Sequence, residues 1–241
     1  MLIRYIKGEL LKIIYNKWLL IAIAATMVFI PVMVMTLGSY FGETGVDLLR
    51  SKLIQGFYLG QAGFIVQAGL YFGREYLRSS LRTTLLNTPV RYMLLASKFI
   101  SVTVITAMTF LLSSLISIVL LILENKTGLG VNDVIKMVSV LIPCLISTVE
   151  LVLFTASAVL ISRSMIGSMA VPVSLLLGLG NMLLQYGKAF RFLPSVSTMN
   201  CFFIIEAPNY LSINSGLLVQ GIWCLIALTL GWILFSRRTV R

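Results

Sequence analysis

The sequence predicts an all-α integral membrane protein, with six transmembrane helices in a single domain spanning residues 1–241. Hydrophobic residues make up 59% of the chain and charged residues only 11%, and the mean hydropathy of +0.99 is far above that of soluble domains. Uncharged windows recur along the chain, and a helix of about 20 residues suffices to cross a hydrocarbon layer of about 30 Å. The expected transmembrane helices cover residues 18–37, 53–73, 99–123, 137–161, 165–184 and 216–235.

The basic residues predict the orientation. An even number of spans puts both termini on one side, and most of the 19 Lys and Arg residues then fall in segments on that side. Cytoplasmic segments are enriched in Lys and Arg, so both termini of this multi-pass cell (plasma) membrane protein are expected in the cytoplasm. Basic residues beside span ends also interact with anionic lipid headgroups, which explains the net charge of +11 without nucleic acid. Membrane lipid is therefore an expected partner.

Residues 1–17 predict an interfacial amphipathic helix. Apolar residues fall on one stripe at helical spacing, while the basic residues Arg4, Lys7 and Lys12 supply positive charge for lipid phosphates. An ordinary basic flank that anchors the first span is the alternative. The first span is longer than a typical signal-peptide core and no small-residue cleavage site follows it, so we expect it to be retained.

One face of the second span carries small and polar residues. Gly56, Gly60 and Gly63 share a narrow stripe with Gln67, and such stripes let another helix approach closely. The partner helix could belong to this chain or to a second subunit. Gln67 is a candidate for the transport path or for a polar lock between helices.

Residues 74–98 form a basic segment between the second and third spans. Two rows of residues repeat at a spacing of four, which is one turn of a helix: Arg74, Arg78 and Arg82, and Leu77, Leu81 and Leu85. Thr88 and Pro89 then interrupt the pattern as an N-cap followed by a proline at the first helical position. The segment predicts a short amphipathic helix on the membrane surface, a break, and a new helix.

Glu150 is the ionisable residue expected deep inside a span. A charge there is costly, so an intramembrane carboxyl suggests ion coupling, a substrate contact or a polar lock to another helix. A hydrogen bond to a neighbour such as Ser147 or Ser157 is the simplest alternative. The last outer segment, 185–215, is apolar and contains Pro194 and Pro208, which predicts short re-entrant half-helices packed against the spans.

Several kinds of chemistry are absent from the sequence. The chain has no histidine, which excludes Ser-His-Asp catalysis and histidine-containing zinc sites, and its three cysteines show no metal-binding spacing. No G-x-x-x-x-G-K-[ST] phosphate loop occurs. We therefore expect no catalytic residue, no metal site and no cofactor bound by this chain, and ATP would have to bind another polypeptide.

The segment R-E-x-x-x-x-S-L-R-T-T-L-L-x-T-P-V-R, with the amphipathic N-terminal helix and the long last outer segment, resembles the permease subunits of type-2 ABC exporters. The resemblance implies that residues 1–17 are the elbow helix and that 74–98 is a coupling hairpin that docks on the ATPase. A smaller contact would come from the turn at Arg163. The implied coupling residues are Arg74, Glu75, Arg78, Ser80, Leu81, Arg82, Thr83, Leu85, Thr88, Pro89, Arg91 and Arg163.

The same resemblance implies the partners and the activity. The permease would pair with a second copy or a sibling subunit and with a cytoplasmic ABC ATPase that binds ATP and Mg. Relatives of this size export peptides, lantibiotics or hydrophobic drugs in bacteria, often for immunity. Two alternatives remain: a secondary transporter driven by an ion gradient through Glu150, and a membrane scaffold or sensor that binds partners through its basic helices.

Overall fold

The computed structural model describes residues 2–38, 45–74, 91–124 and 130–237. Helices dominate these ranges, and no strand occurs within them, as the sequence predicts. Five helical segments in the described ranges are long and apolar enough to cross a membrane: 17–36, 92–124, 131–162, 165–186 and 213–237. The class of an all-α membrane protein is therefore confirmed.

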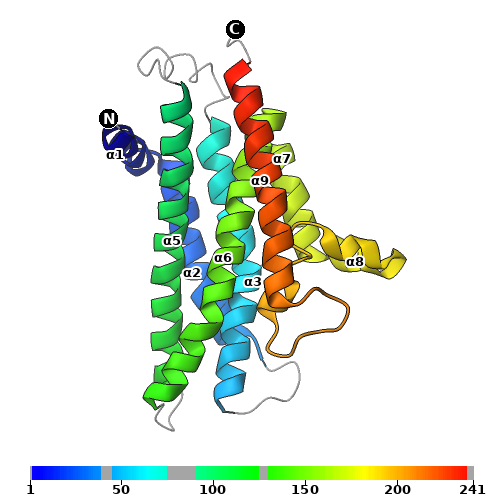
Figure 1. Cartoon of the computed structure of the whole chain (residues 1–241). Helices are drawn as coiled ribbons and strands as arrows, with labels where there is room; N and C mark the ends of the chain where they lie inside the picture. The colour runs from blue at the N-terminus through cyan, green and yellow to red at the C-terminus, as the bar shows by residue number, and fades with distance from the viewer. Residues whose placement is uncertain (1, 39–44, 75–90, 125–129, 238–241) are drawn as a thin grey trace.

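The chain begins with two helices separated by a short turn. Helix α1 covers Leu2–Ile14 and α2 covers Lys17–Thr36. Asn16 ends the turn and caps α2, because its side-chain Oδ1 accepts a hydrogen bond from the Leu19 N–H at 3.4 Å. In Figure 1, α1 lies across the bundle near the end where α9 finishes, so the two ends of the described chain are on the same side.

The central helices form the packed part of the bundle. Helix α3 covers Val46–Gly73, α5 covers Arg91–Glu124 and α6 covers Val131–Ser162. The second expected span, 53–73, lies in α3, which is largely buried between its neighbours but is not one of the five segments above. A count of six spans therefore stays a prediction. Helices α5 and α6 begin several residues before the expected spans 99–123 and 137–161, because uncharged windows cannot detect helical turns that extend beyond the hydrocarbon layer.

The fifth expected span, 165–184, is broken rather than straight. It consists of α7 (Met165–Ser174), the π-helical turn η2 (Leu175–Leu179) and α8 (Gly180–Tyr186). Gly178 has a φ of 139°, a conformation that side chains other than glycine rarely adopt, and the helix bends there. Figure 1 shows α8 projecting sideways from the bundle. Irregular structure thus begins before residue 185.

The segment 185–215 contains two short 3₁₀ helices, η3 (Lys188–Phe192) and η4 (Met199–Phe202), before the last helix α9 (Ile213–Arg237). It packs on the bundle through Gln220 of α9, which accepts a hydrogen bond from Thr198 at 2.7 Å and donates one to the Ser147 carbonyl at 2.8 Å. All three residues are buried. The segment is therefore held against α6 and α9, as its apolar composition indicates.

Candidate functional site

A buried ionic cluster joins three helices, two of which flank the segment 75–90 in the sequence. The Glu9 carboxylate of α1 accepts hydrogen bonds from Lys98 Nζ of α5 at 2.9 Å and from the Tyr71 hydroxyl of α3 at 2.9 Å. Lys12 Nζ binds the other carboxylate oxygen at 2.6 Å. Glu9 and Lys98 are each only 3% exposed. This Glu9 cluster, made of Glu9, Lys12, Tyr71 and Lys98, therefore fixes α1 to the end of α3 and to the start of α5.

Aromatic rings and charge stabilise the cluster. Lys98 Nζ lies 4.9 Å from the centroid of the Tyr71 ring and 5.9 Å from that of Phe72, within cation–π range. Burial raises the pKa of the Glu9 carboxyl, but the positive charges of Lys98 and Lys12 and the hydrogen bonds they donate outweigh this effect. The pKa of Glu9 therefore lies below its ordinary value, and the carboxyl is ionised at neutral pH.

A second contact lies at the α1–α2 turn. The Arg74 guanidinium, directly after α3, donates a hydrogen bond to Asn16 Oδ1, the atom that also caps α2. The C-terminal end of α3 is thus attached to both α1 and α2. Together with Lys98, this contact attaches both helices that flank the segment 75–90 to the N-terminal part of the chain.

The residues predicted to contact the ATPase lie mostly in that segment. Glu75, Arg78, Ser80, Leu81, Arg82, Thr83, Leu85, Thr88 and Pro89 are outside the described residues. Arg91 is the first residue of α5, and Arg4 lies in α1. Lys7 is exposed on α1, whereas Lys12 pairs with Glu9.

Arg163 lies exposed in the turn between α6 and α7. Its φ of 55° ends α6 in the left-handed conformation, and Ser164 then caps α7 by accepting from the Gly167 N–H. A Cβ added to Gly73 would lie 2.5 Å from Met165 Cγ, so this turn is next to the end of α3. The turn at Arg163 therefore lies at the same end of the bundle as the end of α3, after which the predicted coupling segment follows in the sequence.

The glycine face of α3 packs within the chain. Added Cβ atoms at Gly56, Gly60 and Gly63 would lie 2.4–2.5 Å from side-chain atoms of α2. Gln67 continues this face and donates to Thr26 Oγ1 of α2 at 2.9 Å. The stripe is thus an intramolecular contact between α3 and α2, and Gln67 is placed as a polar link between them.

Glu150 lies on α6 opposite α9. A Cβ added to Gly221 of α9 would lie 3.2 Å from Glu150 Oε1, and Glu150 Oε2 is buried with no hydrogen-bond partner among the described residues. The hydrogen bond from Glu150 to Ser147 or Ser157, which the sequence offered as an alternative, is not seen. Ser147 instead accepts a hydrogen bond from Gln61, and Ser157 donates one to the Leu153 carbonyl. Glu150 is therefore close to α9 without a polar partner there.

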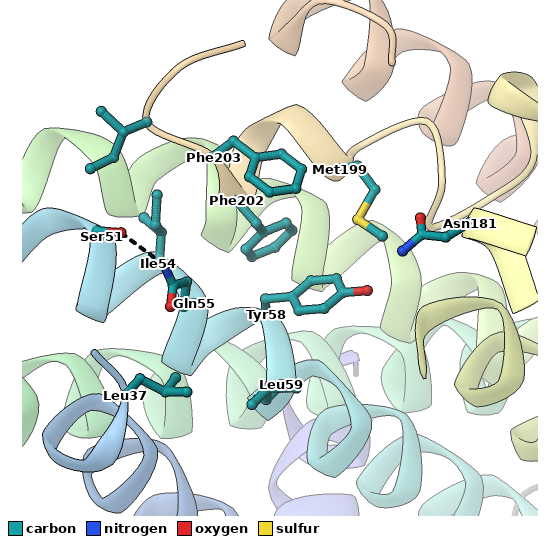
Figure 2. Close-up of a pocket in the computed structure, with 11 residues that line it drawn as sticks. Leu37, Ser51, Ile54, Gln55, Tyr58, Leu59, Asn181, Met199, Phe202 and Phe203 are labelled. Carbon is teal, nitrogen blue, oxygen red and sulfur yellow. Dashed lines mark hydrogen bonds between the residues drawn. The ribbon is translucent and has the colours of Figure 1, made fainter. Parts of the chain in front are cut away.

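An apolar pocket of about 240 Å³ opens at the far end of α3 from the Glu9 cluster. Figure 2 shows Tyr58 of α3 next to Phe202 of the outer segment, with Phe203 beyond Phe202 and Leu59 on the other side of Tyr58. The Tyr58 and Phe202 rings are 5.5 Å apart between centroids. Gln55 and Asn181 add polar groups to the wall. The pocket suits an apolar or amphipathic molecule.

Three residues of these contacts were not identified from the sequence: Glu9 and Tyr71 of the Glu9 cluster, and Asn16, which binds Arg74. A signal for Glu9 exists, since it is the one acid in the first seventeen residues and lies at the edge of their apolar stripe. Tyr71 and Asn16 carry no comparable signal, because a tyrosine in a span and an asparagine in a turn are both common. Within the described ranges, no group of three or more Cys, Asp or Glu side chains is placed to hold a metal ion.

The described helices and their apolar surface define a multi-pass helical membrane protein. Residues 5–181 match the family described as ABC-2 family transporter protein, and the chain belongs to this family. It is therefore a membrane-spanning permease subunit of an ABC transporter, a role that implies a partner ABC ATPase. No curated protein matches the chain. The family match extends from α1 into α8 and includes the whole segment between α3 and α5.

Proposed function

We propose that the chain is the permease of an ATP-driven exporter that moves a hydrophobic or amphipathic peptide, antibiotic or lipid-like molecule out of the cell. ATP and Mg bind a separate ATPase subunit, and this chain is not itself an enzyme. The segment 75–90 and the turn at Arg163 form the docking surface for that ATPase. Both termini lie in the cytoplasm of a bacterial cell, and a second permease subunit completes the transporter.

The observation that carries the proposal is the Glu9 cluster. It ties α1 to the helices on either side of the predicted coupling segment, through Tyr71 on α3 and Lys98 on α5. A force applied to the segment by closure of the ATPase would then move α1, α3 and α5 together. Rigid-body displacement of this kind is a common way to convert a local event into a large change.

The apolar pocket supports the nature of the cargo. Its wall combines Tyr58, Phe202 and Phe203 with the amides of Gln55 and Asn181. Gln55 Oε1 is buried without a hydrogen-bond partner in the described part of the chain and is available to a donor on a bound molecule. An amphipathic cargo with an apolar body and a hydrogen-bond donor fits this wall.

Ion-gradient transport through Glu150 is the second candidate. The observation in its favour is the unpartnered Oε2 atom of Glu150. Membership of the ABC-2 family favours ATP as the energy source, and a carboxyl beside Gly221 also suits a structural role in the contact of α6 with α9. We therefore place ATP-driven export first.

Isolation of the tagged chain from its native membrane tests the proposal. We expect a Walker-type ATPase to copurify in stoichiometric amount and its ATP turnover to respond to reconstitution with the permease. A permease that is stable and folded but carries no nucleotide-hydrolysing partner would overturn the proposal and favour the gradient-driven alternative. Transport of an amphipathic peptide into inverted vesicles, with and without ATP, then tests the direction.

A further inference from the structure

A second cavity lies outside the helical bundle. It has a volume of about 580 Å³, is open on one side, and is bordered by α8, η3 and the loop that follows η4. Figure 1 shows that α8 projects from the bundle and that this loop runs beside it. Asn181 borders both this cavity and the apolar pocket, but the other lining residues differ. The cavity is therefore a separate site.

Two cations line this cavity from one turn of helix. Lys188 and Arg191 are the first and fourth residues of η3. A 3₁₀ helix has three residues per turn, so side chains at i and i+3 lie on the same face. No acidic residue lines the cavity, and neither cation forms an ion pair within the described ranges. Two like charges are thus held together without a compensating carboxylate.

Hydrogen-bond donors are left available beside these charges. The Tyr210 hydroxyl donates to Asn181 Oδ1 at 2.8 Å, which occupies the carbonyl oxygen of that amide and leaves its NH₂ group as a donor. Arg191 Nε is buried, and no acceptor for it exists in the part of the chain that the structure describes. Buried donors normally have partners, so an acceptor brought by a ligand would complete the site.

The position of η3 is fixed by its neighbours. The Trp223 indole of α9 donates to the Phe192 carbonyl at 2.8 Å, and the Arg191 guanidinium lies 5.0 Å from the centroid of the Phe192 ring. Arginine held in this way presents a planar set of donors that matches a phosphate or a carboxylate. We name this cavity the η3 cation pocket.

Apolar groups also line the pocket. Leu184 of α8, Pro208 and the ring of Tyr210 lie in its wall beside the polar and charged groups. A ligand with an anionic group and an apolar body would therefore be bound at both ends. We propose that the η3 cation pocket binds the phosphate or carboxylate of an anionic amphiphile, with a phospholipid of the surrounding leaflet as its occupant. This site is independent of ATP coupling.

Lipid binding to the full-length chain, purified with its ATPase, tests this site. The complex is placed in nanodiscs of phosphatidylcholine with increasing phosphatidylglycerol, and native mass spectrometry measures the lipid that stays bound. Removing a charged donor from a bound anion weakens binding by about 10-fold or more, and we expect this loss for Lys188→Gln and for Arg191→Gln. Arg191→Lys, which keeps the charge, should lose less.

The control is Lys136→Gln, which removes one exposed cation from α6 outside the pocket. Unchanged lipid binding in Lys188→Gln and Arg191→Gln, or an equal loss in Lys136→Gln, would overturn the assignment. Competition with glycerol 3-phosphate distinguishes the two sources of the anion. Displacement of lipid indicates a site for the phosphate group alone, whereas lipid binding that resists competition indicates that the apolar body is also needed. In both outcomes the lipid binding of the wild type should depend on Lys188 and Arg191.

Discussion

Glu9 of α1 and Lys98 of α5 form an ion pair of 2.9 Å although they are 89 positions apart in the sequence. Both side chains are almost fully buried. A buried charge pair of this kind contributes little net stability, but removal of one partner leaves the other charge uncompensated. The pair therefore makes the position of α1 depend on that of α5.

Glu9→Gln is expected to destabilise the permease by about 3–5 kcal/mol, because the Lys98 ammonium is then buried without a carboxylate. Unfolding in detergent, followed by circular dichroism, measures the change. Lys12 is half-exposed, so Lys12→Gln is the matched control and should cost about 1 kcal/mol or less. The double variant Glu9→Leu/Lys98→Met should recover much of the stability. Equal effects of Glu9→Gln and Lys12→Gln would contradict the buried pair.

The pH dependence of stability has a defined sign. The pKa of Glu9 is lowered in the folded protein, so its contribution is present above the ordinary value of 4.5 and is lost as the pH falls through the lower folded value. We expect the stability difference between the wild type and Glu9→Gln to be constant from about pH 6 to 8 and to shrink at about pH 3 to 4. A difference that instead shrinks above about pH 6 would mean that another group titrates.

Gly60→Ala tests the close contact of α2 with α3. The new Cβ would lie 2.5 Å from Ile30 Cγ1, so overpacking should cost about 1–3 kcal/mol. Gly8→Ala is the control, because nothing lies within 4 Å of its new Cβ and alanine favours a helix. The thermal unfolding temperature should fall in Gly60→Ala and should stay the same or rise in Gly8→Ala. Adding Ile30→Ala to Gly60→Ala should relieve the overpacking. If Gly60→Ala does not destabilise the protein, the glycine face of α3 does not pack closely against α2.

Glu150→Gln should leave ATP-driven transport largely intact. Glutamine keeps the size of the side chain beside Gly221, and no hydrogen bond that the structure describes depends on the negative charge. Uptake into inverted vesicles measures transport, with the amount of assembled complex as the control. Complete loss of transport in a normally assembled complex would indicate ion or substrate chemistry at this carboxyl.

The helical class and most helix positions could be predicted because uncharged windows and hydrocarbon thickness are properties of the chain alone. The break at Gly178 could not, since a glycine in an apolar run is compatible with a continuous helix. The partner of the glycine face was also undetermined, because Gly60 and Gln67 specify a close contact but not which helix makes it. Burial of Glu9 depends on Tyr71 and Lys98, which are far apart in sequence, so only the folded chain brings the cluster together.

The coupling segment itself provides the most direct measurement. Arg78→Glu/Arg82→Glu should leave a permease that inserts normally, while the charge reversal weakens its contact with the ATPase. The measured quantity is the ratio of cargo transported to ATP hydrolysed in the reconstituted complex, compared with the wild type and with Lys136→Gln. We predict that this ratio falls about 10-fold or more, as expected when charged contacts at an interface are lost. A ratio equal to that of the wild type would contradict the assignment of residues 75–90 to the ATPase.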